Sequence, residues 1–239
     1  MCGFAGYILT EKTWENRETT LVDLTNISKK IMHRGPDDHK VFIDEMDKLG
    51  LVFQRLSILD LSKNAMQPMV SKCKNWLLVF NGEIYNYNDL KSMISNNNTN
   101  WKTNSDTEVI LECIAKYGFL KAISYLDGMF AIAAYCRNDK TLWLARDKFG
   151  EKPLYYSKDC ANNFFFGSDI KALMASKYFK KKIDYDVSNE YIRYGYVPDP
   201  LCILDRTSKL SPGTTLKFNV NKKIKNKEYW NTFYKFSEM

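Results

Sequence analysis

Four short apolar segments follow one another between residues 129 and 167, and they constrain the fold more than any other feature. Residues 129–135, 141–145, 154–157 and 164–167 are rich in aliphatic and aromatic side chains, which is typical of buried strands. The connections between them are shorter than the dozen or more residues that a parallel crossover requires. The pattern therefore predicts antiparallel meanders and argues against a doubly wound parallel sheet.

Other segments predict the remaining elements. Strands are expected at 3–9, 49–58, 76–80 and 214–219, and helices at 21–32, from Asp106 onward and at 186–194. Ser105 or Asp106 is a suitable cap for the second helix, and residues 33–38 have the Gly-Pro-Asp composition of a turn. Helices that flank blocks of antiparallel strands indicate an α+β fold with two packed sheets.

Composition excludes several classes of protein. No apolar run in the 239 residues approaches the ~18–20 residues that span a bilayer. The first residues lack the basic and apolar regions of a secretory signal, so we expect a cytoplasmic protein. The six cysteines have no paired short spacing, and we therefore expect no metal site.

The net charge of +7 comes from the last part of the chain. Lys and Arg balance Asp and Glu through Ile170, whereas 14 basic residues face 7 acidic ones from Lys171 onward. The excess lies in 180–182 and 222–227, where arginine and interleaved aromatic residues are scarce. A lysine-rich solvated surface explains this composition better than a nucleic-acid site, so we expect no nucleic-acid partner and no membrane partner.

Cys2 is the first candidate catalytic residue. Its small side chain permits removal of Met1, which would leave a thiol and a free α-amine on one residue. The amine titrates near ~8, so part of it is an uncharged base beside the nucleophile at neutral pH. The chain contains only His33 and His39, and this arrangement needs no histidine base. A cysteine that follows the start codon by chance is the alternative.

Asn81 and Gly82 follow an apolar strand and supply a side-chain amide and a backbone N–H. These are the donors that stabilise the oxyanion formed when a thiol attacks an amide. Asn-Gly is also the strongest signal of a plain β-turn, and on its own the pair favours the turn. Arg55, in an apolar run, has the fork that binds a carboxylate, and Glu83 and Asp106 have the charge that binds an ammonium group. Structural ion pairs would explain these three charged residues equally well.

Seven motifs together resemble one family. In order along the chain they are Cys2–Gly6, His33–Asp37, Gln54–Asp60, Asn81–Asn86, Ser105–Glu108, Leu126–Ala131 and Arg146–Tyr156. They resemble the glutaminase domain of the asparagine synthetase family, a class II amidotransferase with an N-terminal nucleophile, from Cys2 to about Trp230. The amidotransferases that make glucosamine phosphate or phosphoribosylamine share the Cys-Gly start but lack the Arg-Gly-Pro-Asp and Asn-Gly-Glu-Ile-Tyr-Asn motifs.

The resemblance implies a fold and a role for each candidate residue. The fold is a four-layer α-β-β-α sandwich of two antiparallel sheets. Cys2 is the nucleophile and its amine the base, and Asn81 and Gly82 form the oxyanion hole. The glutamine carboxylate is held by Arg55 and the backbone of Leu56, Ser57, Ile58 and Leu59, and the ammonium by Glu83 and Asp106.

The resemblance also implies the organisation and partners of the chain. Residues 2–220 form the amidotransferase domain, and 221–239 begin a linker toward a synthetase domain that these residues do not include. No glycine-rich phosphate loop is present, so ATP and Mg²⁺ are expected only in that synthetase domain, and this domain needs no cofactor. The expected activity is hydrolysis of L-glutamine to glutamate and ammonia for asparagine synthesis from aspartate. A synthetase domain or partner subunit accepts the ammonia.

Two other functions agree with the same fold. One is a regulatory module without turnover, which the complete set of candidate residues argues against. The other is an N-terminal-nucleophile hydrolase of a different amide, such as an acyl amide. Arginine and acidic residues for a zwitterionic amino acid favour glutamine over an acyl chain.

Overall fold

The computed structural model describes residues 2–96, 99–219 and 224–230. The chain divides into two compact units, one formed by residues up to 56 and 153–211, the other by residues 57–152 and those from 212 onward. The predicted extension at 221–239 and the basic run at 222–227 lie partly outside the described residues. The domain boundary after residue 220 stays a prediction. No helix in the described part of the chain is long and apolar enough to cross a membrane.

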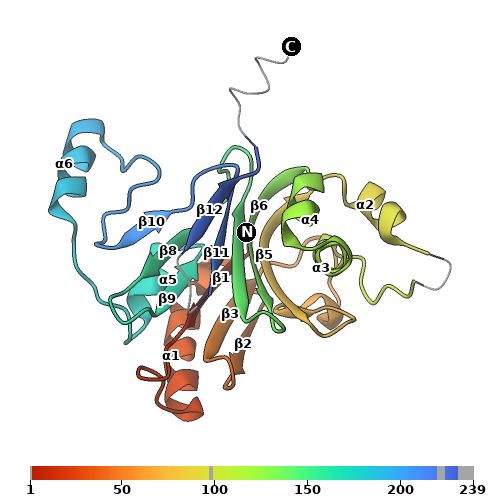
Figure 1. Cartoon of the computed structure of the whole chain (residues 1–239), viewed down its shortest axis with the longest axis horizontal. Helices are drawn as coiled ribbons and strands as arrows, with labels where there is room; N and C mark the ends of the chain where they lie inside the picture. Colours follow the sequence, from red (N-terminus) through yellow and green to blue (C-terminus); the bar gives the residue numbers. More distant parts are fainter. Residues whose placement is uncertain (1, 97–98, 220–223, 231–239) are drawn as a thin grey trace. The chain divides into compact units, whose positions relative to one another are not determined.

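The first unit contains an antiparallel sheet with the strand order β10-β8-β9-β1-β3-β2 (Figure 1). The strands are β1 (Gly3–Ile8), β2 (Asp38–Asp44), β3 (Leu49–Arg55), β8 (Tyr155–Lys158), β9 (Phe164–Gly167) and β10 (Thr207–Lys209). Helices α1 (Arg17–Lys30) and α5 (Ile170–Ala175) belong to the same unit, as do the short 3-10 helix at Met32–Arg34 and α6 (Tyr185–Tyr194). The expected strands at 3–9 and 49–58 are confirmed as β1 and β3, although β3 ends three residues early.

Helix α1 has a clear cause in the sequence. The side chain of Asn16 caps its first turn by accepting a hydrogen bond from the backbone N–H of Thr19. Its apolar stripe, Leu24 and Ile27, packs against Tyr7 and Val52 of the sheet in one apolar cluster. The helix was predicted at 21–32, and the cap explains why it begins four residues earlier.

The second unit contains an antiparallel sheet with the strand order β12-β11-β7-β6-β5-β4. The strands are β4 (Met69–Val70), β5 (Trp76–Ile84), β6 (Gly128–Cys136), β7 (Thr141–Arg146), β11 (Thr214–Phe218) and β12 (Lys225–Glu228). The helices are α2 (Tyr87–Ile94), α3 (Asp106–Tyr117) and α4 (Phe119–Tyr125), with a 3-10 turn at Lys63–Ala65. Apolar residues of α3 and α4 join β5 and β6 in one core cluster, so these helices cover one face of the sheet.

The four apolar segments between 129 and 167 are all strands, but they do not form one meander. β6 pairs with β7 in the second unit, and β8 pairs with β9 in the first. The chain passes from one unit to the other at Pro153, between the two hairpins. The α+β class with two antiparallel sheets is confirmed, and β12 shows that β11 is not the last strand.

Candidate active site

Cys2 lies immediately before β1, which is an interior strand of the first unit's sheet. β1 pairs with β3 so that Gly3 is opposite Gln54, which brings Cys2 beside the end of β3. The backbone N–H of Leu56 donates to Sγ of Cys2 over 3.3 Å, and Sγ lies 3.4 Å from the carbonyl oxygen of Leu56. Cys2 is only partly buried. The thiol is therefore held by the backbone of Leu56 and retains access to solvent.

Arg55 is the last residue of β3 and has 5% of its surface exposed. Its carbonyl accepts a hydrogen bond from the backbone N–H of Asp37 over 3.1 Å, and Pro36 forms a β-bridge with it. Residues 33–38 were predicted as a turn; they lie in the 3-10 helix Met32–Arg34, then in this bridge, and at Asp38 they begin β2. Two of the family-like motifs thus meet at Arg55.

Arg34 is a candidate residue for which no role was predicted. Its Nε donates to the carbonyl oxygen of Cys2 over 3.4 Å, and its Nη2 is buried without a hydrogen-bond partner among the described residues. A Cβ at residue 3 would lie 2.8 Å from Cδ of Arg34, so Gly3 leaves room for this side chain. Its position in the His33–Asp37 motif was the available signal.

Asn81, Gly82 and Glu83 lie inside β5 in the second unit, and the predicted turn at Asn-Gly is wrong. The strand continues to Ile84 because each residue pairs with β6, Asn81 with Ala131 and Gly82 with Phe130. A Cβ at residue 82 would lie 2.1 Å from the carbonyl oxygen of Met129, so only glycine fits there.

The side chain of Asn81 has an unusual environment. Asn81 is 1% exposed, and its Nδ2 has no hydrogen-bond partner within the part of the chain that is described. A buried amide donor without a partner costs free energy, and such groups are rare in native proteins. The position is thus suited to a group that donates a hydrogen bond to a ligand.

Asp106 is the first residue of α3, after the cap Ser105, whose hydroxyl accepts from the backbone N–H of Thr107. Its Oδ2 accepts from the backbone N–H of Ile84 over 3.1 Å, which ties the helix to the end of β5. Burial raises the pKa of Asp106 to about 6, and repulsion from Glu83 adds to the effect. Hydrogen bonds from Ile84, Thr107 and Ser105 lower that pKa, but by less. The two predicted ammonium ligands are therefore neighbours.

Residues 57–59 form no helix or strand. Ile58 and Leu59 are 68% and 44% exposed, and Ser57 is partly buried. The next residue, Asp60, accepts a hydrogen bond from the backbone N–H of Asn104 over 2.8 Å. This bond anchors the segment to the residues that precede α3. The structure thus groups Cys2, Arg55 and Leu56 in the first unit, and Asn81, Gly82, Glu83 and Asp106 in the second.

The motif at 146–156 shapes a loop. Asp147 is 1% exposed and its carboxylate accepts from the backbone N–H groups of Phe130, Phe149, Glu151 and Lys152. Arg146 donates to the carbonyl oxygens of Gly150 and Lys152. These bonds stabilise the path of the chain after β7, so the motif's contribution is structural.

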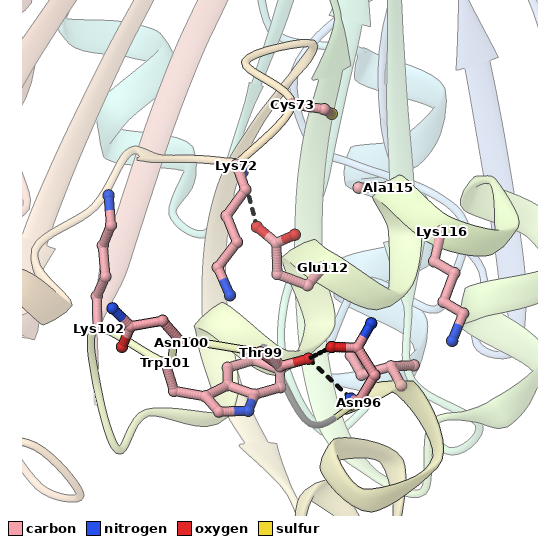
Figure 2. Close-up of a pocket in the computed structure, with 11 residues that line it drawn as sticks. Lys72, Cys73, Asn96, Thr99, Asn100, Trp101, Lys102, Glu112, Ala115 and Lys116 are labelled. Carbon is pink, nitrogen blue, oxygen red and sulfur yellow. Dashed lines mark hydrogen bonds between the residues drawn. The ribbon is translucent and has the colours of Figure 1, made fainter.

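A separate hollow of about 610 Å³ lies in the second unit beside α3 (Figure 2). Two of the charged side chains that line it interact with other lining residues. The carboxylate of Glu112 accepts a hydrogen bond from the backbone N–H of Lys72, and the ammonium of Lys72 lies 4.8 Å from the ring centre of Trp101. None of the predicted site residues lines it. In the described part of the chain, no three His, Cys, Asp or Glu side chains are grouped as metal ligands would be.

Comparison with known proteins agrees with these observations. Residues 1–230 match the sequence profile of a family described as the glutamine amidotransferase domain. The glutamine-hydrolysing asparagine synthetase 1 of Bacillus subtilis is 34% identical over 98% of this chain and 36% of its own length. The chain spans less than half the length of three curated relatives that it matches, all of them asparagine synthetases by name.

Two solved structures are similar in fold. One is described as the allosteric regulatory enzyme of purine biosynthesis, with a TM-score of 0.68, 17% identity, and coverage of 96% of this chain and 49% of that one. The other is glutamine phosphoribosylpyrophosphate amidotransferase from B. subtilis, with a TM-score of 0.61, 19% identity and the same coverage. At these identities the likeness shows the fold, which is the α+β N-terminal-nucleophile hydrolase fold expected from the sequence.

Proposed function

Because the chain belongs to the glutamine amidotransferase domain family, we propose that it hydrolyses L-glutamine to glutamate and ammonia with Cys2 as the nucleophile. The observation that carries this proposal is the buried Nδ2 of Asn81, a hydrogen-bond donor without a partner in the described chain. It adjoins Gly82, where no side chain fits. Hydrolysis of an amide by a thiol needs such a preorganised donor for the oxyanion.

The proposed reaction has two stages. After removal of Met1, the α-amine of Cys2 takes the thiol proton, and Sγ attacks the side-chain amide carbon of glutamine. The oxyanion accepts hydrogen bonds from Nδ2 of Asn81 and the backbone N–H of Gly82. The protonated amine gives its proton to the leaving nitrogen, so the C–N bond breaks, ammonia leaves and a thioester remains. Water, deprotonated by the amine, then attacks the thioester through a second oxyanion, and glutamate leaves as Sγ is protonated again.

Substrate recognition is proposed to use charge. Arg55, with the backbone of residues 56–59, binds the α-carboxylate, and Asp106 and Glu83 bind the α-ammonium. Support comes from the chemistry of the pairs: a guanidinium fork matches a carboxylate, and two neighbouring carboxylates suit an ammonium group. The Leu56 N–H that donates to Sγ of Cys2 holds the proposed nucleophile in place.

The wider role is proposed from the longer relatives. Glutamine-hydrolysing asparagine synthetases suggest that the ammonia serves asparagine synthesis from aspartate, in a synthetase domain or partner subunit that uses ATP and Mg²⁺. The glutaminase step proposed here uses only groups of the chain itself and needs no cofactor. A cytoplasmic location is part of the proposal; the six cysteines, none of them in a disulfide, are compatible with a reducing compartment.

The decisive experiment measures glutamate and ammonia release by protein whose N-terminus has been determined by intact mass. Protein that begins at Cys2 should hydrolyse glutamine, and protein that retains Met1 should not. Cys2→Ala should fold and be inactive. Full activity in protein that retains Met1, or in Cys2→Ala, would place the nucleophile elsewhere.

A further inference from the structure

Gln67 lies buried between β5 and α3, and both ends of its side-chain amide are hydrogen-bonded. Oε1 accepts from the backbone N–H of Phe80 over 2.6 Å, and Nε2 donates to Oγ1 of Thr107 over 3.3 Å. Only 4% of Gln67 is exposed. A buried amide that is bonded at both ends fixes the position of one element relative to the other.

The partners of Gln67 adjoin the candidate site residues. Phe80 precedes Asn81, and Thr107 follows Asp106. Oγ1 of Thr107 donates to Oδ1 of Asp106 over 3.4 Å. A hydroxyl has one proton, and since Oγ1 accepts from Gln67, that proton is available to Asp106. The bonds therefore run in one direction, from Phe80 through Gln67 and Thr107 to the carboxylate of Asp106.

A second connection joins the same two elements. Oδ2 of Asp106 accepts from the backbone N–H of Ile84. β5 is thus tied to the start of α3 at Phe80 and at Ile84. The three candidate residues Asn81, Gly82 and Glu83 lie between these two points.

We propose that Gln67 is a positioning residue that, through Thr107, orients the carboxylate of Asp106 for the α-ammonium group of glutamine and also fixes the start of the Asn81–Glu83 segment. This inference rests on the proposed function, which gives Asp106 and Asn81 their roles. Gln67 itself touches no reacting atom. Its loss should therefore act through the residues that it holds.

Two substitutions separate the two ends of Gln67. Gln67→Glu keeps an acceptor for the Phe80 N–H but cannot donate to Thr107, whose hydroxyl proton then turns toward the new carboxylate and away from Asp106. Thr107→Val removes the hydroxyl and keeps the shape. Because a hydrogen bond to a charged group is lost in each variant, KM for glutamine should rise roughly tenfold while kcat stays within about threefold. Gln67→Met removes both the hydrogen-bond acceptor for Phe80 and the donor to Thr107. It should lower kcat as well, because the start of the Asn81–Glu83 segment is then no longer fixed.

The des-amino analogue of glutamine distinguishes positioning from a general loss of structure. It has no ammonium group, so its KM should change by less than about threefold in Gln67→Glu and Thr107→Val. The acid limb of kcat/KM for glutamine should also move to higher pH, since a carboxylate that loses a donor binds its proton more tightly. Two other acidic side chains lie near Asp106. Glu83 is on β5 and raises the pKa of Asp106 by repulsion. Glu108 is two residues further along α3, and its carboxylate accepts hydrogen bonds from the backbone N–H groups of Lys102 and Thr103.

Ser71→Ala is the matched control. Ser71 is 2% exposed in the same unit, and its Oγ accepts from the backbone N–H of Trp76 at the far end of β5. It should lower stability, measured by urea unfolding, without changing KM for either substrate. The inference is overturned if Gln67→Glu and Thr107→Val behave like this control, or if KM rises equally for both substrates. A wild-type protein without glutaminase activity would instead refute the proposed function.

Discussion

Replacing Asp106 by Asn is expected to stabilise the fold and to weaken glutamine binding. Burial raises the pKa of Asp106 from 3.8 to about 6. The folded protein therefore binds the proton more tightly than the unfolded chain, and it holds the charged carboxylate at a cost. An uncharged side chain of the same shape removes that cost.

The magnitude follows from the two pKa values. Multiplying the difference between 3.8 and about 6 by about 1.36 kcal/mol gives about 3 kcal/mol. The cost is absent below pH 3.8, where the carboxyl is protonated in both states, grows between 3.8 and about 6, and is complete above that pH. Asn retains an acceptor for the Ile84 N–H and offers N–H donors to the hydroxyls of Ser105 and Thr107. Asp106→Asn should therefore raise the free energy of unfolding by about 1–3 kcal/mol at pH 7.5.

The assay is urea unfolding of both proteins from pH 4 to 7.5, together with kcat/KM for glutamine and its des-amino analogue. The stability gain should grow with pH, and the loss of kcat/KM should be confined to glutamine. Glu108→Gln is the control on the same helix. Glu108 accepts from the backbone N–H groups of Lys102 and Thr103 and from the Thr103 hydroxyl, so its replacement should destabilise the fold.

Two results would refute the reasoning. A loss of stability in Asp106→Asn that is the same at every pH would mean that the carboxylate is needed as a structural acceptor. An equal loss of kcat/KM on both substrates would mean that Asp106 supports the fold of the site and does not bind the ammonium.

Three further substitutions test the other residues. Asn81→Ala should lower kcat by roughly 10²–10³ with a smaller change in KM, as measured by steady-state kinetics, and an unchanged kcat would remove Asn81 from the oxyanion hole. Gly82→Ala should lower the free energy of unfolding by at least about 2 kcal/mol, since its Cβ would clash with the carbonyl of Met129; normal urea unfolding would contradict this. Arg55→Lys should lower kcat/KM for glutamine and for its des-amino analogue by the same factor, because both substrates carry the α-carboxylate. A loss limited to glutamine would argue against Arg55 as the carboxylate ligand.

Elements with a local cause were predictable from the sequence. β1 is a continuous apolar segment, and α3 begins at a serine cap before an apolar stripe. β2 was missed because only Val41–Ile43 of its seven residues are apolar, and the strand is exposed or half-buried at the edge of a sheet. The sheet to which each hairpin belongs was also not predictable, since local spacing does not distinguish one sheet from another.

The Asn-Gly pair shows where a local signal is overridden. In isolation it favours a two-residue turn, because both residues tolerate unusual backbone geometry. In the structure, Gly82 is present because a side chain would clash with Met129 across the strand pair. The same two residues can therefore form a turn or continue a strand. Only the pairing with β6, about 50 residues later in the chain, determines that they continue the strand here.

Residues that were predicted for the site carry recognisable chemistry: a thiol, a guanidinium, a carboxylate or an amide. Gln67 and Arg34 carry the same kinds of groups, yet their positions depend on bonds to residues far away in sequence. Gln67 reaches Phe80 and Thr107, 13 and 40 residues away, and Arg34 reaches Cys2 across 32 residues. A motif can reveal groups suited to bind a substrate, but groups that hold them in place are defined by tertiary contacts. This difference is why kinetics with a substrate lacking one charge, and not activity alone, is the appropriate test of Gln67.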